Sequence, residues 1–170
     1  MGPELSVQIK LMKKVSKNSG FMMVETLVAA SIIAVSVLVS MTVAQKSVYI
    51  SRQALHTAQA AFLLEEGAEM VRILRDNSWN NISNLTAGTT YYPTFSGSAW
   101  TLSTTGSTVG IFTRSLTISS VNRDDTTKDI VNSSGTPDSG TKLFTVTVSW
   151  GEGGTTITKT LKFYIANIFS

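Results

Sequence analysis

The feature that most constrains this chain is an apolar run over residues 21–44, FMMVETLVAASIIAVSVLVSMTVA, in which Glu25 is the one charged residue. As an α-helix this run would be about 36 Å long, more than the roughly 30 Å of a bilayer's hydrocarbon core. A secretory signal has a shorter apolar region, of about 7–15 residues, followed by a small-residue cleavage site. No such site follows here. The run therefore predicts a membrane anchor that stays with the protein.

The charge of the chain is concentrated before this run. Lys and Arg total 14 against 11 Asp and Glu, a net charge of +3. Residues 1–20 contain four lysines and one glutamate and account for the whole excess. A basic flank predicts that the N-terminal side of the anchor stays in the cytoplasm. Because the rest of the chain is neutral, no nucleic-acid binding is expected from the folded part.

Composition also argues against most enzymes. The chain has no cysteine and a single histidine, His56, which excludes disulfides, thiol nucleophiles and sites with several histidines. We therefore expect neither catalysis nor a cofactor, and we interpret His56 as a residue on a helix surface. A membrane-anchored hydrolase that uses only Ser and Asp is an open but poorer alternative.

The helical pattern continues past the apolar run. Residues 45–75 are rich in good helix formers, and no proline occurs between Pro3 and Pro93. An apolar stripe is predicted to pack on the rest of the fold, with Phe62 in the core; it comprises Val48, Leu55, Phe62, Leu63, Met70 and Leu74. Glu65, Glu66 and Glu69 are predicted to form a solvated face, with an i,i+3 pair between Glu69 and Arg72. The pattern predicts one helix of about 55 residues that ends near Asp76.

The second half of the chain alternates like β-strands. Residues 142–150 place Phe144, Val146, Val148 and Trp150 on one side, and residues 155–165 alternate in the same way. Gly151–Gly154 is interpreted as a four-residue hairpin loop between them. Two earlier strands are expected at residues 112–118 and 100–104, with residues 76–98 and 122–141 as long connections. A helix that covers one face of an antiparallel sheet, an α+β fold, is the predicted architecture.

The junction over residues 17–30, KNSGFMMVETLVAA, resembles the cleavage and methylation segment of the type IV pilin superfamily. This superfamily includes type IV pilins, minor pilins and the pseudopilins of type II secretion and competence. Gly20, Phe21 and Glu25 match its pattern. The resemblance implies that a prepilin peptidase cuts after Gly20 and that the new amine of Phe21 is N-methylated. It also implies that Phe21 and Glu25 pair between neighbouring subunits during assembly.

The resemblance implies a pilin-like division of the chain: a cleaved leader (1–20), a transmembrane and assembly half of the helix (21–44), an amphipathic half (45–76), and a head of loop and antiparallel sheet (77–170). Because cysteine is absent, a minor pilin or pseudopilin is favoured over disulfide-bearing major pilins. Such a subunit would cross the bacterial cytoplasmic membrane once and then join an extracellular pilus (fimbrium) or a periplasmic pseudopilus. The alternative is a membrane-anchored surface module for adhesion or carbohydrate binding that never polymerises.

The acidic segment RDDTTKD over residues 123–129 remains open between two interpretations. Calcium takes 6–8 oxygen ligands, which makes Asp124, Asp125 and Asp129 candidate ligands. The spacing lacks the glycine and the terminal glutamate of an EF-hand loop. A polar turn between strands is therefore the favoured interpretation, and no metal is expected.

Overall fold

The computed structural model describes residues 19–169, which divide into two compact units. The first unit contains residues up to Arg52, and the second begins at Gln53. Helix α2 (Ser19–Asn77) contributes to both. Most of the predicted leader, residues 1–18, lies outside the described residues.

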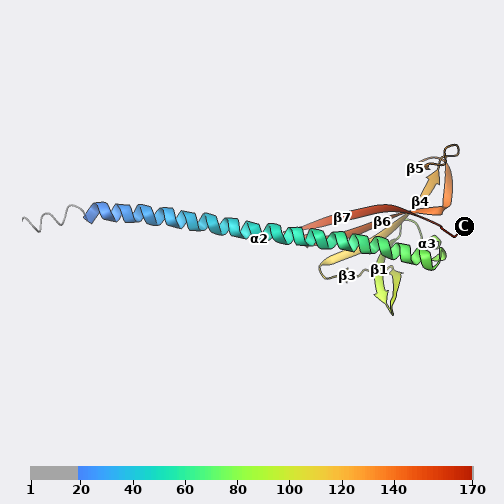
Figure 1. Cartoon of the computed structure of the whole chain (residues 1–170), viewed down its shortest axis with the longest axis horizontal. Helices are drawn as coiled ribbons and strands as arrows, with labels where there is room; N and C mark the ends of the chain where they lie inside the picture. The colour runs from blue at the N-terminus through green and yellow to red at the C-terminus, as the bar shows by residue number, and fades with distance from the viewer. Residues whose placement is uncertain (1–18, 170) are drawn as a thin grey trace, which may run out of the picture. The chain divides into compact units, whose positions relative to one another are not determined.

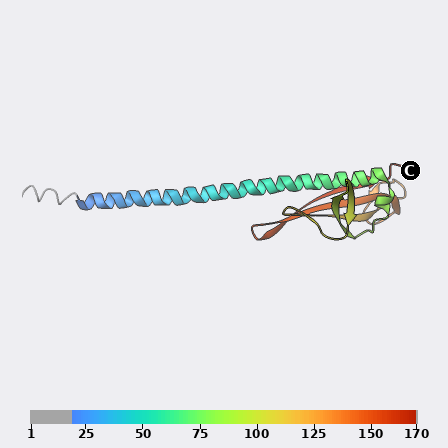
Figure 2. The ribbon, with the colours of Figure 1, turned by 90° about the horizontal axis from the view of Figure 1, so that it is seen from below.

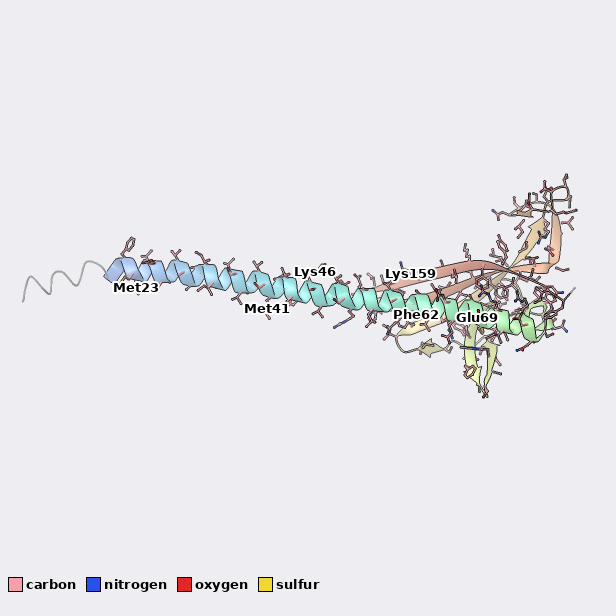
Figure 3. The ribbon with its side chains drawn as sticks, in the orientation of Figure 1. Met23, Met41, Lys46, Phe62, Glu69 and Lys159 are labelled. Atoms are coloured by element: carbon pink, nitrogen blue, oxygen red, sulfur yellow. The ribbon has the colours of Figure 1, made fainter. Side chains whose placement is uncertain are left out.

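The first unit is a single stretch of helix with an exposed surface. Every residue from Gly20 to Arg52 is exposed, and Figure 3 shows Met23 and Met41 projecting freely from the helix. By length and composition, α2 contains a stretch apolar enough to cross a membrane. Such a surface is stable only when lipid or other apolar surface covers it.

The second unit contains one antiparallel sheet with the strand order β2-β1-β4-β6-β7, while the short strands β3 and β5 both pair with β4 (Figure 1). The strands are β1 (Thr90–Ser96), β2 (Ala99–Ser103), β3 (Thr108–Val109), β4 (Phe112–Arg123), β5 (Ile130–Val131), β6 (Thr136–Glu152) and β7 (Thr155–Ala166). A one-turn helix, α3 (Asn80–Ser83), follows α2. The predicted strands over residues 100–104, 112–118, 142–150 and 155–165 are all present.

The core lies between the sheet and the part of α2 in the second unit, which covers one face of the sheet (Figure 2). The four inward residues predicted for β6, Phe144, Val146, Val148 and Trp150, are at most 3% exposed. From α2 the core receives Ala60, Met70, Val71 and Leu74. The predicted α+β architecture of a helix on an antiparallel sheet is confirmed.

The predicted packing face of the helix was partly wrong. Val48, Leu55 and Phe62 are 60%, 55% and 71% exposed, whereas Met70 and Leu74 are buried as expected. An α-helix has 3.6 residues per turn, so a strict seven-residue spacing drifts around it by about 20° per repeat. The residues that face the sheet are small where the two layers meet closely, at Ala60, Gly67 and Ala68. Selecting the face by its large apolar side chains therefore selected the wrong one.

The two predicted long connections contain regular structure. Residues 76–98 include α3 and β1, and residues 122–141 include β5 and the start of β6. Strand β1 was missed because Pro93 interrupts its pattern, and proline is normally confined to edge positions or bulges. Pro93 pairs with Leu102 of the edge strand β2.

The predicted four-residue hairpin loop is also shorter than expected. Glu152 pairs with Thr155, so only Gly153 and Gly154 form the turn. Both have positive φ, at 59° and 82°, as a two-residue type I′ turn requires. Gly151 and Glu152 belong to β6, which places Glu152 opposite α2.

Candidate functional site

The apolar part of α2 satisfies all of its own hydroxyl groups. Each Ser or Thr in residues 21–44 donates a hydrogen bond of 2.5–3.0 Å to a backbone carbonyl one turn earlier; these residues are Thr26, Ser31, Ser36, Ser40 and Thr42. Back-bonding of this kind removes the cost of placing a hydroxyl in an apolar medium. The segment therefore presents hydrocarbon on nearly all of its surface.

Glu25 is the exception on that surface. It is exposed, and its carboxylate has no hydrogen bond or ion pair to any described residue. A carboxylate at the centre of a membrane helix costs about 2.5–3.5 kcal/mol. No described residue offsets this cost for Glu25. A group on another molecule that paired with the carboxylate would therefore stabilise it.

Gly20 and Phe21 lie in the first turn of α2, and Phe21 is 78% exposed. Phe21 and Glu25 are one helical turn apart and share a face of the helix. Gly20 is helical in the structure, whereas a peptidase must take the backbone at its cleavage site in extended form. The first N–H groups of a helix have no intrahelical partner, so this turn unwinds at low cost.

In the second unit, the sequence did not reveal an ion pair between the buried Arg114 and the exposed Glu66. Arg114 is 3% exposed, and its Nη1 donates a hydrogen bond of 2.7 Å to Oε2 of Glu66 on α2. Its guanidinium also lies 5.4 Å from the ring centre of Trp100. Glu66 is thus not part of a purely solvated face. The signal was present, because Arg114 occupies an inward position between Phe112 and Leu116 in the alternation of β4.

His56 is likewise not a simple surface residue. Its side chain is 18% exposed, packs edge-on against Phe112, and places Nδ1 3.6 Å from Oε1 of Glu152. The other carboxylate oxygen of Glu152 accepts a hydrogen bond of 3.0 Å from Nε1 of Trp150. His56 and Phe62 also line a shallow apolar groove of about 490 Å³ beside Ile111.

The acidic segment that follows β4 forms a hydrogen-bonded turn. Oδ1 of Asp124 accepts hydrogen bonds from the backbone amides of Thr126 and Thr127, both at 2.8 Å. The amide of Thr127, followed by that of Thr126, lowers the pKa of the Asp124 carboxyl. The carboxylate of Asp125 accepts a hydrogen bond from Thr136.

Asp124 and Asp125 thus make hydrogen bonds to different groups and do not point to one common site. Among the described residues, no three His, Asp or Glu side chains gather where they could hold a metal ion, and Asp129 joins neither neighbour in such a group. The geometry is that of the polar turn. Glu69 and Arg72, by contrast, form the predicted i,i+3 pair at 3.0 Å.

Comparison with protein-family models, with curated proteins and with solved structures finds no match to this chain.

Proposed function

We propose that this chain is a pilin-like structural subunit that waits in the membrane, is cut after Gly20 by a prepilin peptidase, and assembles through α2 into a pilus or pseudopilus. The observation that carries this proposal is Glu25, the one polar side chain in residues 21–44 without a hydrogen bond among the described residues.

Cleavage would supply the missing partner. Hydrolysis of the Gly20–Phe21 peptide bond leaves an α-ammonium on Phe21. In a bundle of apolar helices that ammonium and the Glu25 carboxylate of a neighbouring subunit each lose their water, and pairing offsets most of the cost. The pair then sets the register between two helices rather than adding much net stability. The same carboxylate would assist methylation of the amine.

The exposed hydrocarbon of the first unit supports the same proposal. A helix with this surface is stable in a bilayer before assembly, with its basic flank in the cytoplasm. In a filament, identical helices cover each other's apolar surface instead. The second unit, with its own core, would then lie outside the helical bundle.

The decisive experiment is the mass of the natural chain, taken separately from the membrane and from sheared surface filaments. We expect a filament form that begins at Phe21 and carries one methyl group. A chain that keeps its first 20 residues in every fraction would contradict the proposal and favour a non-polymerising surface module.

A further inference from the structure

A hollow in the second unit lies where α2 ends. It is about 320 Å³, at the lower end of the range for small-molecule sites. It is lined by Leu74, Asn77, Asn81, Leu85, Trp100, Thr101 and Leu102. These residues come from the C-terminal end of α2, from α3 and the loop after it, and from strand β2.

One wall of the hollow is an indole held in place by its neighbours. The guanidinium of Arg114 lies 5.4 Å from the ring centre of Trp100, and the ring of Phe95 lies 5.1 Å away at 59°. Trp100 is only partly buried. A rigid aromatic ring offers apolar contact area while losing little conformational entropy on binding.

Two amides on the helical side of the hollow remain able to bind a ligand. Nδ2 of Asn81 donates a hydrogen bond of 3.0 Å to the carbonyl of Leu74, which orients the side chain and leaves Oδ1 as an acceptor. Asn77 is exposed, and its side chain makes no hydrogen bond to the described residues, so it offers two donors and an acceptor. Strand β2 pairs only with β1, so its outer backbone groups are unpaired as well.

The chemistry of the lining selects a class of ligand. None of the described residues that line the hollow is charged, so a phosphate or carboxylate would find no counter-charge there. A wholly apolar ligand would leave the amides without partners. A sugar ring has an apolar C–H face for the indole and hydroxyl groups that both donate and accept. We propose that this hollow binds a neutral saccharide, with Trp100 as the stacking surface and Asn77 and Asn81 as hydrogen-bonding groups.

This inference is independent of assembly and is testable on the full chain in micelles of a zwitterionic detergent, which has no sugar headgroup. The probes are the methyl glycosides of glucose, galactose, mannose and N-acetylglucosamine. The chain has three tryptophans, so ¹⁵N labelling of tryptophan resolves three indole signals. We expect at least one glycoside to shift the Trp100 signal saturably and to leave unchanged the signal of Trp150, which belongs to a separate cluster of the core.

The variants separate a built site from surface adsorption. Asn77→Ala should weaken binding by roughly three- to tenfold, the effect of one lost hydrogen bond. Asn80→Ala, an exposed asparagine of α3 outside the hollow, is the matched control and should leave the affinity unchanged. Trp100→Ala removes the reporting indole, so binding to this variant is measured by saturation-transfer NMR on the glycoside, and we expect that transfer to be lost. An unchanged Trp150 signal would show that the core is intact.

Three results would overturn the proposal. The first is no saturable shift with any of the four glycosides. The second is equal affinity in the wild type and Asn77→Ala. The third is saturation of the Trp100 signal by an extended threonine-rich peptide but by none of the sugars, which would assign the β2 edge to peptide binding.

Discussion

A β-carbon placed on Gly67 of α2 would lie 2.8 Å from Cγ1 of Val146 on β6. Val146 is fully buried at the centre of the sheet, and its branched side chain has little rotational freedom there. Gly67 therefore sets how closely the helix approaches the sheet. Helix propensity by itself predicts only that a glycine at this position costs about 1 kcal/mol relative to alanine.

Gly67→Ala should destabilise the second unit despite its better helix propensity, because overpacking a core costs about 1–3 kcal/mol. Urea unfolding of residues 46–170, a fragment that we expect to be soluble and folded, provides the measurement. In a Val146→Ala background the same change should become neutral or stabilising, since the clashing methyl groups are gone. A stabilising effect in the wild-type background would show that the contact relaxes freely.

The exposure of Phe62 predicts a contrast between two phenylalanines. Phe144→Ala should cost about 3–5 kcal/mol, as expected for a fully buried aromatic residue. Phe62→Ala, at a position 71% exposed, should change the stability of the monomer by less than about 0.5 kcal/mol. A large loss of unfolding free energy from Phe62→Ala in the same assay would instead support the prediction from sequence that Phe62 packs in the core.

The ion pair between Arg123 and Asp138 predicts a loss of stability in acid. Nε of Arg123 donates a hydrogen bond of 2.6 Å to Oδ2 of Asp138. This bond, with further hydrogen bonds from Thr141 and the amide of Gly140, lowers the pKa of the Asp138 carboxyl below 3.8. In the unfolded chain the carboxyl takes up its proton at a higher pH than in the folded chain. The contribution is therefore complete well above pH 3.8 and is lost as the pH falls through the folded pKa.

Asp138→Asn should consequently lower the unfolding free energy at pH 7 and flatten its dependence on pH between about 5 and 2. Asp129→Asn is the matched control, because that carboxylate is exposed and has no hydrogen bond or ion pair to the described residues. If the unfolding free energies of the two variants depended on pH in the same way, the Asp138 carboxylate would not be a source of the loss of stability in acid.

A bulky residue at Gly20 should block processing without disturbing the fold. No atom lies within 4 Å of a β-carbon built there, so Gly20→Leu is tolerated by the described structure. If a peptidase must take this backbone in extended form, the added side chain should leave a membrane-bound precursor about 20 residues longer. Ala29→Leu, equal bulk further along the same helix, should be processed normally. Mass spectrometry that finds mature Gly20→Leu protein would count against cleavage at this bond.

Assembly should depend on Glu25 more than membrane insertion or folding does. Glu25→Gln removes the counter-charge of the Phe21 ammonium, and leaving one charge of a buried pair alone typically costs about 3–5 kcal/mol. Insertion of the single chain should become easier, since a lone carboxylate is removed. The variant should thus insert and fold but enter filaments weakly, as measured by quantitative immunoblotting of sheared filaments. Thr26→Val, which removes a neighbouring hydroxyl that bonds only to its own helix, should assemble normally. Wild-type incorporation of Glu25→Gln would exclude the pairing role.

The elements predicted most accurately were those specified by local, uninterrupted patterns. The apolar run over residues 21–44 has one charge and no proline, and the structure has all of it in helix α2. Strand β6 alternates Phe144, Val146, Val148 and Trp150 with small polar residues, which is sufficient to choose its buried face. The isolation of Glu25 follows from the same stretch, because helical hydroxyls bond to their own backbone and a glutamate there does not.

Tertiary structure alone decided which face of α2 packs and which polar residues meet. Gly67 and Ala60 face the sheet because two layers approach closely only where side chains are small, and a hydrophobic pattern gives small residues little weight. Arg114 is buried because Glu66 lies opposite it, 48 residues away in the chain, and Trp100 lies beside Asn77 because β2 returns to the end of α2. By itself the sequence determined the long apolar helix, the helix-on-sheet layout and the isolated carboxylate, since these arise from patterns within one segment. The ion pair of Arg114 with Glu66 and the hollow beside Trp100 arise from contacts between distant segments, which no periodicity within one segment predicts.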